Sequence, residues 1–404
     1  MHPEDDIRKQ VLVQYKAELE KELEEILSFW CDYTVDSGNG GFYGSVSNAN
    51  IPEINAPKGV VLYSRILWTF SSAYRFRPKP EYLVMAKRAY DYILTYFIDK
   101  TFGGVYWSVD ATGNILDAKK QIYGLAFCIY GLSEYYKVSK DEQALESAIA
   151  LFHLIEDKSF DKEKNGYIEA YARDWTEISD LRLSEKDNNE RKTMNTHLHI
   201  VEAYANLFSV WPDAGLKKKI ENLLWLFLRY FFNNNNRHYN LFFNDDWEQQ
   251  SSLRSYGHDI EAAWLLQQCA ERIGHEEHTE AFKRLAVTVT YATNEGIDED
   301  GGLWYEFEPG MNLLISEKHS WPQAEAMIGY FNTYQLTGDE SCLRQSLQSW
   351  EFVKKYIKDN QNGEWFWGVN KDYSVMQKDK AGFWKCPYHN SRACMELMDR
   401  IANN

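Results

Sequence analysis

The chain carries at residues 39–44 the turn Asn39-Gly40-Gly41-Phe42-Tyr43-Gly44, and related turns recur along the rest of its 404 residues. In five of six such turns glycine is followed by aromatic side chains, whereas the fourth has lost its glycine. The spacing is roughly 60 to 70 residues, and a fixed period is typical of a repeat architecture. The other turns are Phe102-Gly103-Gly104-Val105-Tyr106-Trp107, Asn165-Gly166-Tyr167-Ile168, Arg237-His238-Tyr239-Asn240-Leu241-Phe242, Asp300-Gly301-Gly302-Leu303-Trp304-Tyr305 and Asn362-Gly363-Glu364-Trp365-Phe366-Trp367.

Long segments with helical periodicity lie between the turns. Residues 81–97 have apolar side chains close to the 3.6-residue period, which predicts an outer helix with one buried face. Residues 59–76 are apolar on all sides, which predicts a buried inner helix. About twelve such segments are present. They start near Asp6, Gly59, Glu81, Lys119, Asp141, Lys192, Leu216, Gly257, Thr279, Ser320, Gly338 and Tyr388.

Twelve helices in six pairs predict an all-α fold, an (α/α)6 barrel of six inner and six outer helices. Short, β-hairpin-like Gly-Gly-aromatic turns would join outer to inner helices, because glycine permits positive φ and close backbone approach. An open helical solenoid is the alternative, but six units in a chain of this length favour a closed ring. Since the repeat runs from end to end without a Pro/Ser-rich linker, we expect one domain over residues 1–404.

Composition excludes several classes of protein. A net charge of −16 argues against binding to nucleic acid or anionic membranes. Residues 1–20 are charged throughout and no run approaches ~18 apolar residues, so we expect neither a signal peptide nor a membrane span. The six cysteines lack Cys-x-x-Cys spacing, and no nucleotide-binding glycine loop is present. We therefore expect a cytoplasmic protein without metal or cofactor. We also expect a monomer.

Two histidines share helix faces with polar partners. His258 and Glu261 project from one face, and a carboxylate beside an imidazole raises and orients its basicity. A helix-capping cluster is the structural alternative. His199 shares a face with Asn195, while His197 points elsewhere; a satisfied core histidine is the alternative there. Charged and polar pairs on otherwise apolar inner helices favour a functional role.

The remaining candidates come from three other predicted inner helices. His389 lies at the entrance of the last helix, which Pro387 should start, with Trp384 just before it. Arg65 lies within an apolar helix, where a buried arginine needs a partner: either a polarised group in the barrel or a structural ion pair. Trp321 begins another helix and could stack on a sugar or fill the barrel mouth. In a closed ring these helix starts converge on one pocket, and its histidines favour acid/base chemistry over metal binding.

At these positions the chain resembles the cellobiose 2-epimerases of the N-acylglucosamine 2-epimerase superfamily of (α/α)6 barrels. The resemblance covers almost the whole chain. Its most specific matches are Ser64-Arg65-Ile66-Leu67-Trp68, Lys192-Thr193-Met194-Asn195, Ser255-Tyr256-Gly257-His258-Asp259-Ile260-Glu261-Ala262 and Trp384-Lys385-Cys386-Pro387-Tyr388-His389-Asn390.

The resemblance implies reversible inversion at C2 of the reducing-end sugar of a β-1,4-linked disaccharide, such as cellobiose, lactose or mannobiose. It implies no metal and no nucleotide. The family's two acid/base histidines match His258 and His389, with Glu261 adjusting His258. Arg65 and His199 match positions that polarise the C1 oxygen and stabilise the enediolate. Positions that hold sugar hydroxyls or assist ring opening match Tyr123, Asp187 and Asn195, and those that stack on sugars match Trp321 and Trp384.

Three other readings of the same residues compete. An N-acylglucosamine 2-epimerase or an aldose–ketose isomerase would use the same enediolate chemistry, and the motif at residues 384–390 favours the disaccharide enzymes. A glycoside hydrolase would need two carboxylates, for which Asp174, Asp187 and Glu325 are candidates, but would leave the histidines unexplained. A helical-repeat binding module would present a concave surface instead of a closed pocket.

Overall fold

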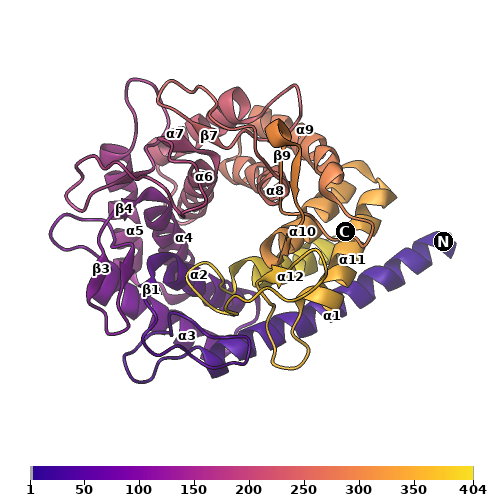
Figure 1. The fold of residues 1–404 in the computed structure, drawn as a ribbon, viewed down its shortest axis with the longest axis horizontal. Helices are drawn as coiled ribbons and strands as arrows, with labels where there is room; N and C mark the ends of the chain where they lie inside the picture. The colour runs from indigo at the N-terminus through magenta and orange to yellow at the C-terminus, as the bar shows by residue number, and fades with distance from the viewer. Residues whose placement is uncertain (1–2, 404) are drawn as a thin grey trace.

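The computed structural model describes residues 3–403, which form two concentric layers of helices (Figure 1). All twelve predicted helices are present, so the predicted all-α (α/α)6 architecture is confirmed. The inner layer consists of α2 (Val60–Phe76), α4 (Ile122–Ser139), α6 (Met194–Phe208), α8 (Tyr256–Ile273), α10 (Ser320–Thr337) and α12 (Tyr388–Ala402). The outer layer consists of α1 (Pro3–Tyr33), α3 (Pro80–Tyr92), α5 (Glu142–Lys158), α7 (Ala214–Leu226), α9 (Glu276–Thr293) and α11 (Glu340–Phe352).

The ring is closed. Each inner helix packs against the next, and α12 packs against α2, so that the two ends of the chain complete the barrel (Figure 1). Val46, which follows the first turn, forms an antiparallel bridge with Ala381, which precedes α12. The open solenoid is therefore excluded. The helix α2 is buried continuously from Val60 to Ala73, as its all-round apolar sequence predicts.

All six turns are closed in the same way. Each is closed by one antiparallel bridge between the residue that enters the turn and the residue that leaves it. In the first turn both glycines have positive φ, and a Cβ on Gly41 would lie 2.5 Å from Tyr63 Oη. In the fourth turn Arg237 adopts the left-handed conformation at φ 66°, so the turn survives the loss of its glycine. The six bridges are Val35–Phe42, Ile98–Val105, Phe160–Tyr167, Phe232–Tyr239, Ile297–Leu303 and Lys358–Trp365.

Short strands tie neighbouring repeats together at the same end of the barrel. The two residues before an inner helix pair with residues that follow the next turn, which fixes where each inner helix begins. These pairs are β1 (Lys58–Gly59) with β2 (Ser108–Val109), β4 (Lys120–Gln121) with β5 (Ala170–Tyr171), β6 (Lys192–Thr193) with β7 (Phe242–Phe243), β8 (Arg254–Ser255) with β9 (Glu306–Glu308), and β11 (Lys318–His319) with β12 (Gly368–Val369). Two further strands, β3 (Ile115–Asp117) and β10 (Leu313–Ile315), extend the sheets of β2 and β9.

An ion pair with a buried lysine recurs beneath five of the six turns. An aspartate at the start of the turn accepts a hydrogen bond from a lysine that precedes an inner helix. The fourth turn has Asn233 instead, and the corresponding Arg254 pairs with Glu295. The five pairs are Asp36–Lys58, Asp99–Lys120, Asp161–Lys192, Asp298–Lys318 and Asp359–Lys380, with N–O distances of 2.8, 2.8, 2.9, 2.6 and 2.6 Å.

Three outer helices end differently from the prediction. The predicted continuous helix over residues 81–97 is α3 followed by a π-helical turn, because Ile98 N–H bonds Ile93 O five residues back. The π-helical turns are η1 (Ile93–Phe97), η2 (Phe227–Phe231) and η5 (Val353–Ile357), and short 3-10 turns occur at η3 (Asn294–Gly296) and η4 (Pro309–Met311). Within residues 3–403, no helix has both the length and the apolar character required to cross a bilayer.

Candidate active site

A cavity of about 360 Å³ lies at the end of the barrel where the inner helices begin. This volume falls in the range typical of small-molecule sites, roughly 300–1,000 Å³. Every inner helix contributes lining residues from its first two turns, so the predicted convergence of helix starts is confirmed. All ten predicted site residues line the cavity: Arg65, Tyr123, Asp187, Asn195, His199, His258, Glu261, Trp321, Trp384 and His389.

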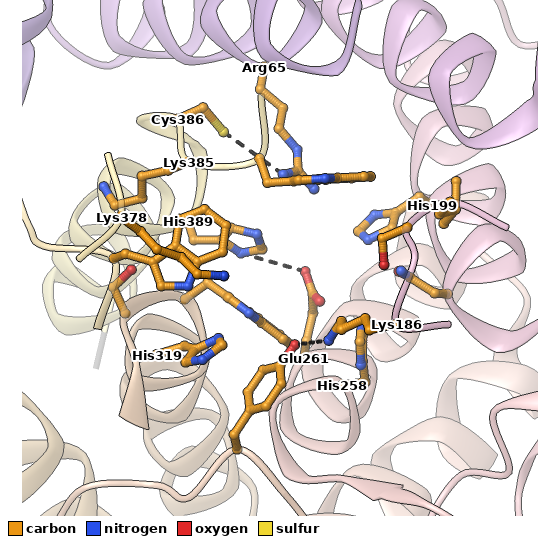
Figure 2. A pocket seen from close by; sticks show the side chains of 18 of the residues that line it. Arg65, Lys186, His199, His258, Glu261, His319, Lys378, Lys385, Cys386 and His389 are labelled. Carbon is orange, nitrogen blue, oxygen red and sulfur yellow. Dashed lines mark hydrogen bonds and ion pairs between the residues drawn. The ribbon is translucent and has the colours of Figure 1, made fainter. Parts of the chain in front are cut away.

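The predicted histidines approach the cavity from different helices. Figure 2 shows His199 and His389 on opposite sides, Arg65 on a third side and Glu261 between them. The rings of His258 and His389 both contact the indole of Trp321, with centroid separations of 4.8 and 5.5 Å. Two imidazoles from α8 and α12 therefore face one small volume.

Glu325 orients His389. Its Oε1 accepts a hydrogen bond from His389 Nδ1 at 2.6 Å, which leaves Nε2 for the cavity. Burial, reinforced by the positive charge of Arg65, lowers the pKa of His389 well below its usual range. The imidazole is therefore uncharged near neutral pH and is available as a base.

Arg392 lies beneath the cavity floor and binds three glutamates. Its Nη1 donates to Glu202 at 2.7 Å, and its Nη2 donates to Glu261 and Glu325, also at 2.7 Å. One guanidinium cannot neutralise three carboxylates, and burial together with the charge of Glu325 raises the pKa of Glu261 to about 7. Burial opposes ionisation of Glu202, but Arg392, His199 and Tyr388 together outweigh it and lower that pKa to about 2.

The predicted partner of Glu261 is wrong. Its Oε1 accepts from Arg392 and lies 3.9 Å from His389 Nδ1, whereas His258 Nδ1 contacts Ser255 Oγ at 2.7 Å. The spacing along α8 places His258 and Glu261 on the same side, but the ring brings Arg392 closer to the carboxylate. Burial and the charge of Lys186 lower the pKa of His258 to about 3.

Arg65 and His199 occupy two neighbouring sides of the cavity (Figure 2). Arg65 Nη2 donates to Tyr123 Oη at 2.7 Å, and its guanidinium lies 4.3 Å from the ring centroid of Phe127. Within residues 3–403 Arg65 forms no ion pair with a carboxylate, so the structural ion pair considered from the sequence is not found. His199 Nδ1 donates to Glu202 at 2.8 Å, which leaves its Nε2 free.

His197 has a structural role, as its position off the shared face predicts. Its Nε2 accepts from Tyr167 N–H at 3.0 Å and its Nδ1 donates to the carbonyl of Thr193 at 2.7 Å. Burial lowers its pKa to about 3. The histidine thereby ties α6 to the third turn in its neutral form.

The cavity walls combine aromatic rings with polar side chains. Trp384 packs against Tyr123 at 5.8 Å between centroids. Asp187 Oδ2 accepts two hydrogen bonds from Ser184, so this carboxylate is held in place. Asn195 Oδ1 is buried and has no hydrogen-bond partner among the described residues.

Sequence reasoning missed much of the cavity mouth and its floor. Lys186 donates to Tyr305 Oη, and the Tyr305 ring stacks on His319 at 3.9 Å. Glu202 carried one signal, since it is the one acidic residue in the largely apolar α6, whereas Arg392 is one of four Asp, Glu or Arg residues in α12 and carried none. The other lining residues missed by sequence reasoning are Leu183, Ser184, Ser320, Trp365, Trp367, Lys378, Lys385, Cys386 and Asn390.

One group of metal-type ligands occurs among the described residues. Donor atoms of Glu261, Glu325 and His389 lie within 4.8 Å of one another. The Arg392 guanidinium already contacts Oε1 of both glutamates, so the positive charge at this point comes from the chain itself. The donor set therefore fits a hydrogen-bonded base better than a cation site.

Comparisons with known proteins agree with this geometry. The model of the family described as N-acylglucosamine 2-epimerase (GlcNAc 2-epimerase) matches residues 41–393. A cellobiose 2-epimerase of Bacteroides fragilis is 47% identical over 385 residues, which cover 95% of this chain and 98% of that protein. The solved structure of cellobiose 2-epimerase from Bacillus thermoamylovorans B4167 superimposes with a TM-score of 0.92 at 40% identity, covering 96% and 99% of the two chains.

A more distant relative is the N-acylglucosamine 2-epimerase of Bos taurus, which is 24% identical over 416 residues and matches 98% of this chain and 93% of its own. The match of the family model over most of the chain and the 47% identity to a full-length relative establish the family. The chain belongs to the N-acylglucosamine 2-epimerase family and is an isomerase.

Proposed function

We propose that the protein is a cellobiose 2-epimerase, which inverts C2 of the reducing-end sugar of β-1,4-linked disaccharides such as cellobiose, lactose and mannobiose. The observation that carries this proposal is that His258 and His389, from different helices, both contact Trp321 in one cavity. Inversion at a carbon requires proton transfer on both faces of a planar intermediate. Two separately held imidazoles meet this requirement, whereas hydrolysis would use two carboxylates.

The reaction begins on the open-chain aldehyde form of the sugar. One histidine removes the C2 proton through Nε2, the C–H electron pair forms the C1–C2 double bond, and the carbonyl π electrons move to O1. The cis-enediolate then turns, and the other histidine takes up a proton from solvent and delivers it to the opposite face of C2. The first histidine releases its proton to solvent, so both imidazoles return to the neutral form. No atom or electron is gained or lost overall, and the same steps run in reverse.

Negative charge develops on O1 during proton removal, and the cavity is built to accept it. Arg65 supplies a buried guanidinium as a donor, and His199 on a neighbouring side, whose Nδ1 donates to Glu202, can donate from Nε2 as well in its doubly protonated form. The positive ends of six inner-helix dipoles point toward the same region. This arrangement stabilises the enediolate more than the neutral sugar, which lowers the barrier to proton abstraction.

Five further residues would hold the disaccharide. Asn195 has an unpaired amide oxygen for a sugar hydroxyl, and Asp187 and Tyr123 offer further polar contacts at the cavity wall. Trp321 and Trp384 present rings of the size that stacks on a pyranose. Of the carboxylates considered for a hydrolase, Asp174 does not line the cavity and Glu325 is committed to His389 and Arg392.

Incubation with cellobiose in D2O, followed by NMR, tests the proposal. The expected product is glucosyl-mannose with deuterium at C2 of the reducing-end sugar. Free glucose would overturn the proposal in favour of hydrolysis, and a ketose as sole product would overturn it in favour of aldose–ketose isomerisation. Conversion of N-acetylglucosamine but of no disaccharide would assign the chain to the N-acylglucosamine enzymes.

A further inference from the structure

Ser255 lies directly before α8, and its hydroxyl contacts a side chain of the helix instead of capping it. A serine at this position of a helix normally accepts a hydrogen bond from a backbone N–H of the first turn. Ser255 Oγ makes no such bond and instead lies 2.7 Å from His258 Nδ1. Thr193, the equivalent residue before α6, does accept from Thr196 N–H at 3.2 Å. The Ser255 hydroxyl is therefore withdrawn from helix capping and directed at the imidazole.

The two histidines of the proposed reaction differ in their partners. His389 has a carboxylate at Nδ1, whereas His258 has a hydroxyl. When Nε2 is the base, Nδ1 of the neutral imidazole carries a proton, and it still carries one in the imidazolium, so the hydroxyl oxygen accepts from Nδ1 in both forms. In each form the contact keeps Nδ1 toward Ser255 and Nε2 toward the cavity.

The backbone of Ser255 is secured independently of its hydroxyl. Ser255 pairs with Glu306 across β8 and β9, and the residue is buried. Loss of the side-chain oxygen therefore leaves the strand pair and the start of α8 in place. A substitution that removes only the hydroxyl therefore tests its contact with His258 without disturbing the backbone.

We propose that Ser255 is a positioning residue for His258, which holds the imidazole with Nε2 facing C2 of the sugar in every protonation state. This inference rests on the proposed function. Without the hydroxyl the ring can turn or change tautomer, and only the proton transfers that use His258 are slowed. The proton transfers that use His389 keep their rate, because Glu325 orients that imidazole.

The test uses Ser255→Ala with each epimer, cellobiose and glucosyl-mannose, separately in D2O. Deuterium at C2 of the recovered sugar measures exchange, and the other epimer measures inversion. Inversion should fall about tenfold, the equivalent of one hydrogen bond. For the epimer that His389 deprotonates, exchange should persist while inversion falls, so their ratio rises. For the other epimer both should fall together.

Two control variants separate positioning from stability. Ser255→Thr keeps the hydroxyl and should restore both rates. Asp213→Ala removes the cap that accepts from Gly215 and Leu216 on the outer helix α7, and should lower Tm without changing either ratio. An equal fall of exchange and inversion for both epimers, or no fall at all, would overturn the inference. Failure of the unmodified enzyme to convert cellobiose would instead overturn the proposed function.

Discussion

Glu325 Oε1 lies 2.6 Å from His389 Nδ1, and this contact decides which nitrogen of the imidazole faces the cavity. The carboxylate accepts the Nδ1 proton, so Nε2 carries the lone pair that can remove a proton from a sugar. The same oxygen accepts from Arg392, which holds the carboxylate in position. Orientation of this base therefore depends on a residue that touches no substrate.

Glu325→Gln should lower kcat by about 100-fold with little change in KM. The amide can donate to Nδ1, which reverses the tautomer and presents an N–H to the sugar where a base is needed. Initial rates at saturating cellobiose, followed by NMR, measure the effect. Glu134→Gln is the matched control, because Glu134 is a buried carboxylate in the C-terminal half of α4 that pairs with Arg75 and Lys137. That variant should lower Tm and leave kcat unchanged; equal kcat values for the two variants would contradict the role of Glu325.

His258→Ala and His389→Ala should each abolish epimerisation and leave the fold intact. Each removes one of two proton-transfer groups, and a group of this kind contributes roughly 10²–10⁴-fold to rate. Epimer formation and the circular dichroism melting curve provide the two readouts. His153→Ala, on the outer helix α5, serves as the control with full activity. Retention of more than about a few per cent of the normal rate in either variant would reject the two-base assignment.

Arg65→Lys should lose activity without an appreciable fall in Tm. Its guanidinium contacts Tyr123 and two aromatic rings but no carboxylate within residues 3–403, so little ion-pair energy is at stake. A lysine retains the charge but not the planar fork that can reach both Tyr123 and a developing oxyanion. We expect kcat to fall about 100-fold, in line with the loss of one oxyanion donor. A parallel fall of kcat and Tm would point instead to a structural role.

The fold could be predicted because its signals are local. Glycine-aromatic turns and helical periodicity are properties of adjacent residues, and they locate all twelve helices. The candidate site followed from polar residues near the starts of apolar helices, which a closed ring must bring together. The π-helical ends of α3, α7 and α11 had no such signal, since their apolar pattern continues the helix that precedes them.

The partners of the site residues could not be predicted in the same way. Arg392 meets Glu202 and Glu261 across 190 and 131 residues of sequence, and only ring closure sets those distances. Helical spacing suggested that Glu261 serves His258, but the carboxylate turns toward the stronger charge of Arg392. Spacing within one helix therefore indicates which residues share a face, but it does not indicate which hydrogen-bond or ion-pair partner each residue has.

His197→Gln should flatten the pH dependence of stability between pH 6.5 and 3. The pKa of His197 is about 3 in the fold, below the ordinary value of 6.5, so the unfolded chain binds more protons in this range. The free energy of unfolding is therefore highest above pH 6.5 and falls as pH decreases, by at most about 1.4 kcal/mol per pH unit from this residue. Urea unfolding from pH 7 to pH 4 measures the slope. An unchanged slope in the variant would show that His197 does not carry this linkage.

Lys58→Met should destabilise the fold far more than Lys87→Met. Lys58 and Asp36 form one of the buried pairs beneath the turns, with side-chain exposures of 1% and 2%, whereas Lys87 and Asp91 form an exposed pair at 60% and 55%. Removing the lysine from the buried pair leaves a carboxylate without its cation, at a cost of about 3 kcal/mol, since Gly38 and Asn39 N–H groups still bind Asp36. Loss of the exposed pair should cost about 0.5 kcal/mol or less. Urea unfolding midpoints give both free-energy changes, provided that the dependence of the free energy of unfolding on urea is the same for the two variants. Similar shifts of the midpoint for the two variants would show that the pair beneath the turn stabilises the fold no more than an exposed pair does.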